Sequence, residues 1–174
     1  PLYSSAASDV YKRQKQDGVG EIVMERDDGL IKFFNDAGVG YAVPDDIDYS
    51  MWLKFTMNIF SNQTSAVLNM TFGEMKYNKA FIDFAKKIIA EVRSVAELKG
   101  INGLENLEKD ALDALSRMCD EGKTSMHQDI LAGRKTEVDI FAGEMIKLGR
   151  ELGVPVPYNQ VLYDMVKIKE AANE

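Results

Sequence analysis

A lysine and two asparagines are spaced four residues apart in one segment of the chain. Lys54, Asn58 and Asn62 occupy positions i, i+4 and i+8, which drift by only about 40° per step on an α-helix and so share one face. An ammonium group can polarise a carbonyl and donate a proton, and amides can hydrogen-bond to carbonyl and hydroxyl groups. This spacing is the strongest chemical signal in the sequence.

The residues around this stripe are mostly apolar. The other side chains of residues 52–62 predict a helix that is largely buried. A buried polar group without a partner costs roughly 1–3 kcal/mol, and a buried ammonium costs more. The stripe therefore indicates either a polar site within a core or a solvent-facing stripe on an ordinary amphipathic helix. Helical period alone favours the solvent-facing interpretation.

A second polar segment, residues 124–139, contains two helix starts separated by a glycine. Ser125, with Gln128 three residues later, has the form of a capping box. Thr136 can cap the following helix, with Glu137 in its first turn, where the helix dipole favours an acid. Capping alone accounts for Ser125 and Thr136, so spacing gives them no further role.

The composition excludes several classes of protein. Hydrophobic residues make up 45% and charged residues 28% of the chain, as in globular proteins, and the net charge of -7 argues against nucleic-acid binding. No apolar stretch approaches the roughly 18 residues of a membrane span. The single cysteine, Cys119, excludes an internal disulfide and suits a reducing cytoplasm. His127, Asp129 and Glu137 are candidate metal ligands, but a solvated or hydrogen-bonded histidine is the better interpretation, and no metal site is predicted.

The beginning of the chain divides into two predicted parts. Residues 1–14 show no helical or strand period, no initiator methionine and no apolar signal-peptide core, so we interpret them as an artefactual or disordered leader. In residues 15–44, strands over 19–25 and 39–43 flank a short helix over 30–37. Two strands do not form a stable sheet by themselves. This α/β stub therefore resembles the edge of a larger structure.

From residue 45 onward the pattern is helical. Apolar residues recur at spacings of three and four, with glycine or proline between the periodic segments. The predicted helices are residues 45–69, 80–99, 104–118, 125–131, 137–152 and 159–171. The predicted fold class is all-α, with a helical domain over residues 45–174 and a short α/β stub at the N-terminus.

Two motifs in this order resemble the C-terminal domain of ketopantoate reductases (2-dehydropantoate 2-reductases). The segment SMHQDILAGRKTEVD, followed by FAGEMIKLGRELGVPVPYNQVLYDMVKIKE, is similar to that domain's signature, and W-x-K-x-x-x-N-x-x-x-N at residues 52–62 resembles its catalytic helix. The match covers residues 18–170. It implies a domain similar to the C-terminal domains of 6-phosphogluconate-dehydrogenase-like enzymes, with residues 15–44 as the remnant of a dinucleotide-binding domain. That domain's G-x-G-x-x-G turn is absent from this sequence.

The resemblance also implies roles for particular residues. Lys54 falls on the family's catalytic lysine, and Glu137 falls on its conserved acid. Asn58, Asn62 and Ser125 fall on substrate-contacting positions. In this interpretation hydride comes from NADPH, the lysine polarises the carbonyl and donates the proton, and the nearby acid holds the lysine in place. The serine, at a helix N-terminus, would receive the substrate carboxylate.

The implied reaction is the reduction of 2-dehydropantoate to pantoate in pantothenate and coenzyme A biosynthesis. NADPH would be bound mainly by the dinucleotide-binding domain, so this chain alone is expected to be inactive. The expected partner is a small 2-oxo acid, without nucleic acid or membrane, in the cytoplasm; a homodimer is left open.

Two alternatives remain. A related NAD(P)-dependent reductase of another 2-oxo or 3-oxo acid would share these motifs, because they fix the reaction type better than the acyl group. A non-enzymatic helical interaction module would merely present the polar stripe to solvent. The Lys54→Ala variant separates the classes, since a module would keep its partner whereas a reductase would lose most of its kcat.

Overall fold

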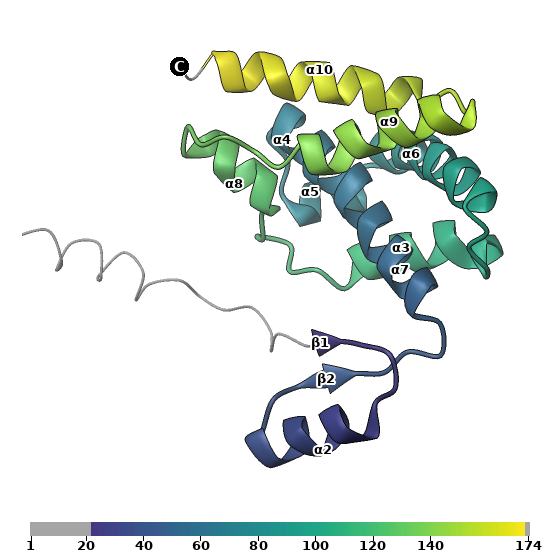
Figure 1. Cartoon of the computed structure of the whole chain (residues 1–174). Helices are drawn as coiled ribbons and strands as arrows, with labels where there is room; N and C mark the ends of the chain where they lie inside the picture. The colour runs from purple at the N-terminus through teal and green to yellow at the C-terminus, as the bar shows by residue number, and fades with distance from the viewer. Residues whose placement is uncertain (1–21, 173–174) are drawn as a thin grey trace, which may run out of the picture. The chain divides into compact units, whose positions relative to one another are not determined.

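The computed structural model describes residues 22–172 of the chain. It contains two compact units, the first ending at Ile47 and the second beginning at Asp48. Figure 1 labels the strands and the α-helices of both units. The predicted leader, residues 1–14, and the first part of the predicted stub lie outside the described residues, so their assignment remains a prediction.

The first unit has the predicted order of strand, helix and strand. It consists of β1 (Ile22–Val23), α2 (Asp28–Ala37) and β2 (Tyr41–Ala42), and the two strands are parallel. Asp27 begins the helix because its side chain accepts hydrogen bonds from two backbone N–H groups, each at 2.9 Å. Gly38 ends the helix in the left-handed conformation, with φ at 66°.

This unit has no core of its own within the described residues. No residue of α2 is buried, and Phe33 is 62% exposed. Apolar side chains from β1, from α2 and from the segment between α2 and β2 remain uncovered, namely Ile22, Val23, Leu30, Phe33 and Val39. Two short strands and one helix do not make an independently stable layer, so this surface needs further structure to cover it.

The second unit is built from helices, as the sequence predicts. Its elements are α3 (Ile47–Met57), η1 (Asn58–Asn62), α4 (Gln63–Leu68), α5 (Phe72–Tyr77), α6 (Lys79–Leu98), η2 (Leu104–Asn106), α7 (Leu107–Ser116), α8 (Ser125–Leu131), η3 (Asp139–Gly143), α9 (Glu144–Leu152) and α10 (Pro157–Ala171). None of the helices in the described part of the chain is both long and apolar enough to cross a membrane.

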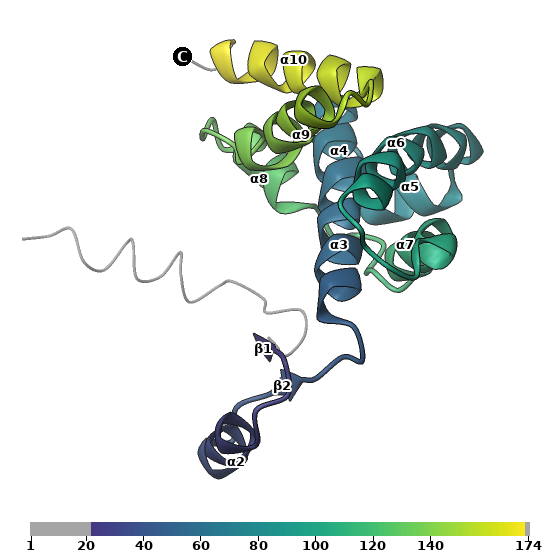
Figure 2. The same ribbon diagram turned by 45° about the vertical axis from the view of Figure 1, so that its right-hand side comes forward.

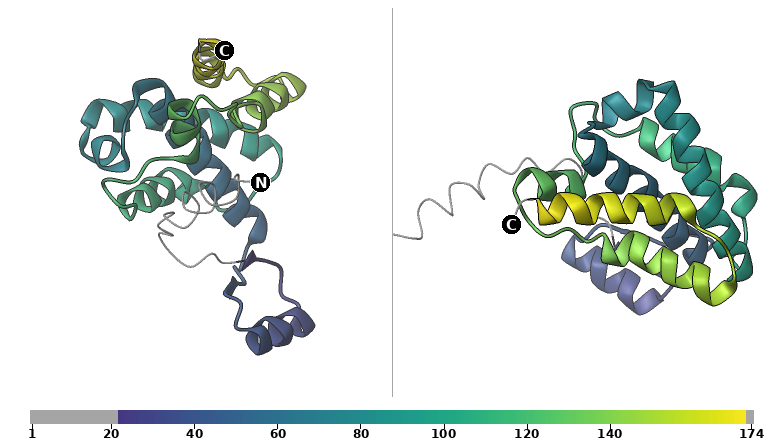
Figure 3. Two further views of the ribbon diagram at one scale, coloured as in Figure 1. Left: turned by 90° about the vertical axis from the view of Figure 1, so that its left-hand side faces the viewer. Right: turned by 90° about the horizontal axis from the view of Figure 1, so that it is seen from above.

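A central rod made of α3, η1 and α4 organises the helices. Figure 2 shows α8 on one side of this rod and α5, α6 and α7 on the other, and α4 and η1 pack against α8 and α6 respectively. Helix α10 packs on α4 and runs alongside α9, as the view from above in Figure 3 shows. Ile59 and Phe60, both fully buried, place the rod in the core.

The middle of the rod is a π-helix rather than the regular α-helix that the sequence predicts. Residues Asn58–Asn62 form this wide turn, with regular helix before and after it. A π-turn holds one residue more than an α-turn and often occurs at functional sites. Hydrophobic period does not show such an insertion, because the apolar residues on either side still follow a helical repeat.

The N-terminus of α10 is held by a carboxylate from α6. Its N-cap residue provides no side-chain cap. Instead, the buried Glu91 accepts hydrogen bonds from the backbone N–H groups of Tyr158 at 2.7 Å and Asn159 at 3.0 Å, and from the Asn159 side-chain amide at 2.8 Å. A negative charge at a helix N-terminus also interacts favourably with the helix dipole. This contact fixes α10 against α6.

The start of the segment before α9 differs from the prediction. Thr136 accepts a hydrogen bond from the Val138 N–H at 3.3 Å, but the helix that follows begins as the π-turn η3. The Thr136 N–H and hydroxyl donate to Glu170 of α10, at 2.6 and 2.7 Å. Thr136 is therefore a tether to α10 as well as a local turn former.

Candidate functional site

A cleft of about 440 Å³ opens beside the central rod. It lies between the α3–η1 segment, the start of α5, the end of α7 and the start of α8. Its lining residues are Ser50, Leu53, Lys54, Met57, Asn58, Ser61, Asn62, Phe72, Ala114, Met118, Lys123, Thr124 and Ser125. The cleft therefore brings together segments far apart in the sequence, including both polar segments that the sequence singles out.

Four of the five predicted site residues line this cleft. Lys54, Asn58 and Asn62 come from the rod, and Ser125 comes from the first turn of α8. The exposed fraction decreases along the stripe, from the exposed Lys54 through the half-buried Asn58 to Asn62 at 5%. The stripe thus descends from the cleft mouth into the protein, which a purely solvent-facing stripe would not do.

The polar groups of these four residues are available to a ligand. Within residues 22–172, the side chains of Lys54, Asn58, Asn62 and Ser125 make no hydrogen bond or ion pair with the protein. Ser61 on the same wall is different, because its hydroxyl donates to a helix carbonyl at 2.6 Å. The amide of the nearly buried Asn62 therefore faces the cleft with hydrogen-bonding capacity that no described protein group uses.

The cleft carries positive charge. Lys54 and Lys123 line it, and no aspartate or glutamate is among its described lining residues. The remaining wall is largely apolar, formed by Leu53, Met57, Phe72, Ala114 and Met118. An apolar hollow with a few converging polar groups is typical of small-molecule sites. Its charge favours a small anion with an apolar portion.

The first turn of α8 corrects the predicted capping box. Thr124, not Ser125, is the N-cap, and its hydroxyl accepts from the His127 N–H at 3.2 Å. The Gln128 side chain does not return to the cap but donates to the Lys123 carbonyl at 3.0 Å. The prediction was wrong by one residue because threonine and serine are both good caps. The correction leaves the Ser125 hydroxyl free to face the cleft.

The loop before α8 is held in place by α5, a helix that the sequence analysis missed. Phe72 N–H donates to the Gly122 carbonyl and Gly73 N–H donates to the Asp120 carbonyl, both at 2.9 Å. The Lys76 ammonium lies 2.5 Å from the Asp120 carboxylate and also donates to the Met118 carbonyl. This docking fixes the cleft wall that α7 and α8 share.

A small residue is required where the two segments meet. A Cβ atom on Gly73 would lie 2.9 Å from the Asp120 Cβ, closer than packed carbons approach. The sequence does contain a signal for α5, since Thr71 and Glu74 form a reciprocal capping box at its start. That signal could have located the helix, although not its contact with the loop.

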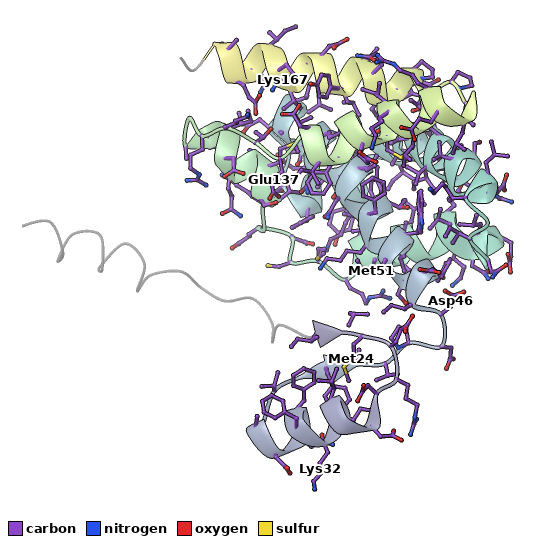
Figure 4. All side chains as sticks on the ribbon, in the orientation of Figure 1. Met24, Lys32, Asp46, Met51, Glu137 and Lys167 are labelled. Carbon is purple, nitrogen blue, oxygen red and sulfur yellow. The ribbon has the colours of Figure 1, made fainter. Side chains whose placement is uncertain are left out.

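Glu137, the fifth predicted residue, does not line the cleft. It is exposed, and Figure 4 labels it in the segment between α8 and η3. Within the described residues, no ion pair joins Glu137 to Lys54. Its role as the acid of the site therefore remains a prediction.

His127 is a structural histidine close to the cleft. It is 1% exposed, and its ring nitrogens lie 3.1 Å from the Met70 carbonyl and 2.6 Å from the Asn69 side-chain oxygen. Burial, followed by the positive charge of Lys123, lowers the pKa of His127 below its ordinary value of 6.5. Among the described residues, no group of three or more potential ligands gathers to hold a metal.

The lowered pKa of His127 predicts a pH-dependent stability. In the unfolded chain this histidine, the only one in the sequence, takes up a proton near its ordinary pKa, whereas in the folded state it resists protonation. The free energy of unfolding should therefore be fully maintained above about pH 6.5 and decrease as the pH falls from there through the folded-state pKa. Urea unfolding between about pH 7.5 and 5.5 measures this slope. A His127→Gln variant should lose most of it; an unchanged slope would contradict the assignment.

The fold and the cleft define a class of protein, a helical domain with a cleft lined by two lysines, two asparagines and serines beside apolar side chains. The chain belongs to the ketopantoate reductase family: the family described as "Ketopantoate reductase PanE/ApbA C terminal" matches residues 46–170. This match includes every residue that lines the cleft.

Individual relatives agree with this family. The chain is 28% identical to the 2-dehydropantoate 2-reductase of Pyrobaculum aerophilum, over 88% of this chain and 55% of that protein. Its structure resembles that of a PanE/ApbA family ketopantoate reductase from Ralstonia eutropha JMP134, with a TM-score of 0.80 and 26% identity, over 90% of this chain and 53% of that one. The fold also resembles D-mandelate dehydrogenase in its ternary structure with NADH and anilino(oxo)acetate, with a TM-score of 0.80 and 23% identity, over 91% and 70% of the two chains. The chain spans about half the length of the curated relatives it matches.

Proposed function

We propose that this chain is the substrate-binding, catalytic-lysine half of an NADPH-dependent 2-dehydropantoate 2-reductase, which reduces ketopantoate to pantoate. The observation that carries this proposal is the convergence of Lys54, Asn58, Asn62 and Ser125 on one cleft without a carboxylate in its described lining. These residues are the ones that the family motifs mark, and they supply the donors that a 2-oxo acid requires.

The nicotinamide cofactor would supply the hydride that reduces the carbonyl carbon. The residues of this chain would bind the substrate and supply the proton. The Lys54 ammonium, which has no protein partner among the described residues, would polarise the carbonyl and give a proton to the developing alkoxide. The amides of Asn58 and Asn62 would hydrogen-bond to the substrate's carbonyl and hydroxyl groups. The Ser125 hydroxyl would bind its carboxylate.

For Glu137 we propose the role of an acid that helps to hold the lysine in position. This part of the proposal rests on the family motif alone, because Glu137 is not among the residues that line the cleft.

The cofactor would bind mainly outside this chain. The uncovered apolar side chains of β1, α2 and the segment between α2 and β2 are what a fragment of a larger α/β layer would expose, and we propose that residues 15–44 are the remnant of a dinucleotide-binding domain. The chain without that domain should therefore be inactive. A cytoplasmic location and a homodimer remain predictions from the sequence.

The apolar wall of the cleft bears on the choice of substrate. Leu53, Met57 and Phe72 line the cleft together with the polar stripe, which suits a 2-oxo acid whose third carbon carries apolar substituents, as in ketopantoate. A different branched 2-oxo acid would make the same apolar contacts with this wall. The shape of the cleft therefore supports the reaction type more strongly than the individual substrate.

The test is steady-state kinetics on the full-length protein that contains this chain. We expect NADPH oxidation with 2-dehydropantoate, at a higher kcat/KM than with other 2-oxo acids or with NADH, and no turnover by the 174-residue chain alone. A preference for another acid would favour the related-reductase alternative. If the full-length protein reduced no 2-oxo or 3-oxo acid, the proposal that it is a reductase would be wrong. If the isolated chain turned over substrate, the prediction that the chain alone is inactive would be wrong.

A further inference from the structure

We infer that Lys123 is the cation that pairs with the carboxylate of the 2-oxo acid, an inference that rests on the proposed function. Neither the helical stripe nor the family motifs mark this residue. It precedes α8 by two positions and lines the same cleft as Lys54. The reaction then uses two lysines from different segments, each acting on a different end of the substrate.

The chemistry of a 2-oxo acid requires this division. One end is a permanent carboxylate, and the neighbouring carbonyl becomes an alkoxide that must receive a proton. An ammonium that gives its proton to the alkoxide is neutral afterwards, so it cannot serve as a lasting counterion. Among the described residues that line the cleft, Lys123 is the only charged side chain besides Lys54. It is therefore the residue suited to hold the carboxylate.

The ammonium of Lys123 is not committed to another partner. The residue is exposed, and it forms no ion pair or side-chain hydrogen bond with the described part of the protein. Glu121 shares a neighbouring surface hollow with it, yet no ion pair joins the two within the described residues. A substrate carboxylate would thus meet a cation that does not first have to break a salt bridge.

The backbone that carries Lys123 is firmly positioned. Its carbonyl accepts the Gln128 side chain at 3.0 Å, and the carbonyl of the preceding Gly122 accepts the Phe72 N–H at 2.9 Å. The following Thr124 is fixed on the rod by a 2.6 Å hydrogen bond between its hydroxyl and that of Ser65. A charge on a preorganised support binds more strongly than one on a mobile loop.

Lys123 also lies in the right place relative to Ser125. The two residues are separated by one position, and both line the cleft. An ammonium and a hydroxyl from one short segment can bind the two oxygens of a carboxylate together, and charge-assisted hydrogen bonds of this kind are the stronger ones. Lys54 and the two asparagines, all on the rod, are then left to the carbonyl end.

The test uses Lys123→Met in the full-length protein. We expect the KM for the 2-oxo acid to rise by about 10-fold or more, while kcat stays within about twofold, because a ground-state binding contact is lost. Lys123→Arg should restore most of the affinity. Lys99→Met is the matched control, since Lys99 is exposed, lies outside the cleft lining and forms no ion pair in the described residues.

A second readout uses the neutral 2-oxo carboxamide of the same acyl group. The wild type should prefer the acid, and Lys123→Met should lose about 10-fold of that preference, which a merely structural defect would not produce. Lys123→Gln serves if the methionine variant does not fold. If the wild type reduces the acid but the substitution changes neither KM nor the acid-to-amide preference, or lowers kcat alone, the inference is wrong and the proposed function stands. Absence of any reductase activity in the wild type would instead overturn the proposed function, and this inference with it.

Discussion

Replacing Lys54 with methionine in the full-length protein is expected to lower kcat for 2-oxo acid reduction by about 10²–10⁴-fold, the range typical of a lost general acid. The ammonium lies at the mouth of a cleft whose described lining contains no carboxylic acid, and the other lysine of that lining, Lys123, is assigned to the far end of the substrate, so the proton has no equivalent donor. The KM should change much less, because the proposed carboxylate contacts, Lys123 and Ser125, lie on another segment.

The same substitution should hardly affect folding. Lys54 is exposed and makes no hydrogen bond or ion pair within the described residues, so the free energy of unfolding should change by less than about 0.5 kcal/mol. Single-turnover rates, compared with the Lys99→Met control, measure the chemical effect. A kcat within threefold of the wild type would show that Lys54 is not the proton donor of the reaction.

Replacing Glu91 with alanine should have the largest effect on stability, lowering the free energy of unfolding by about 3 kcal/mol. This buried carboxylate accepts three hydrogen bonds at the start of α10, two from backbone N–H groups and one from the Asn159 side chain. The substitution leaves those donors without partners in a region that water does not reach easily.

Glu97 on the same helix provides the matched control. It is exposed and pairs with Arg93 one turn away at 2.8 Å, so Glu97→Ala should cost only about 0.3–0.5 kcal/mol. Urea denaturation of both variants gives the comparison. If Glu91→Ala were no worse than Glu97→Ala, α10 would not depend on the carboxylate from α6.

Local pattern predicts most of the helices and one wall of the candidate cleft. The period of three and four located the helices around the core, and the four-residue spacing placed Lys54, Asn58 and Asn62 on what proves to be one cleft wall. Ser125 joins them although 63 positions separate it from Asn62 in the sequence. Only the family resemblance connected the two segments in advance, because helical period carries no information about which helices pack together.

The parts that sequence reasoning missed depend on contacts between distant residues. In the sequence, nothing distinguishes Lys123 from the other lysines. The docking of α5 on the loop before α8 places it at the cleft. Helix α5 has only six residues, too few for a clear hydrophobic period. The support of α10 by Glu91 joins positions 67 residues apart, and a single glutamate inside an amphipathic helix gives no indication of such a partner.

The wide turn Asn58–Asn62 separates two different environments along one rod. Before it, α3 presents side chains to an open cleft; after it, the first four residues of α4 are fully enclosed. In a regular helix each residue is rotated by about 100° from the one before it. The direction in which the side chains of α3 point would then fix the direction in which the side chains of α4 point. The additional residue shifts this register once, at the turn. The face that α3 turns to the cleft and the faces that α4 turns to α8 and α10 therefore follow two helical registers instead of one.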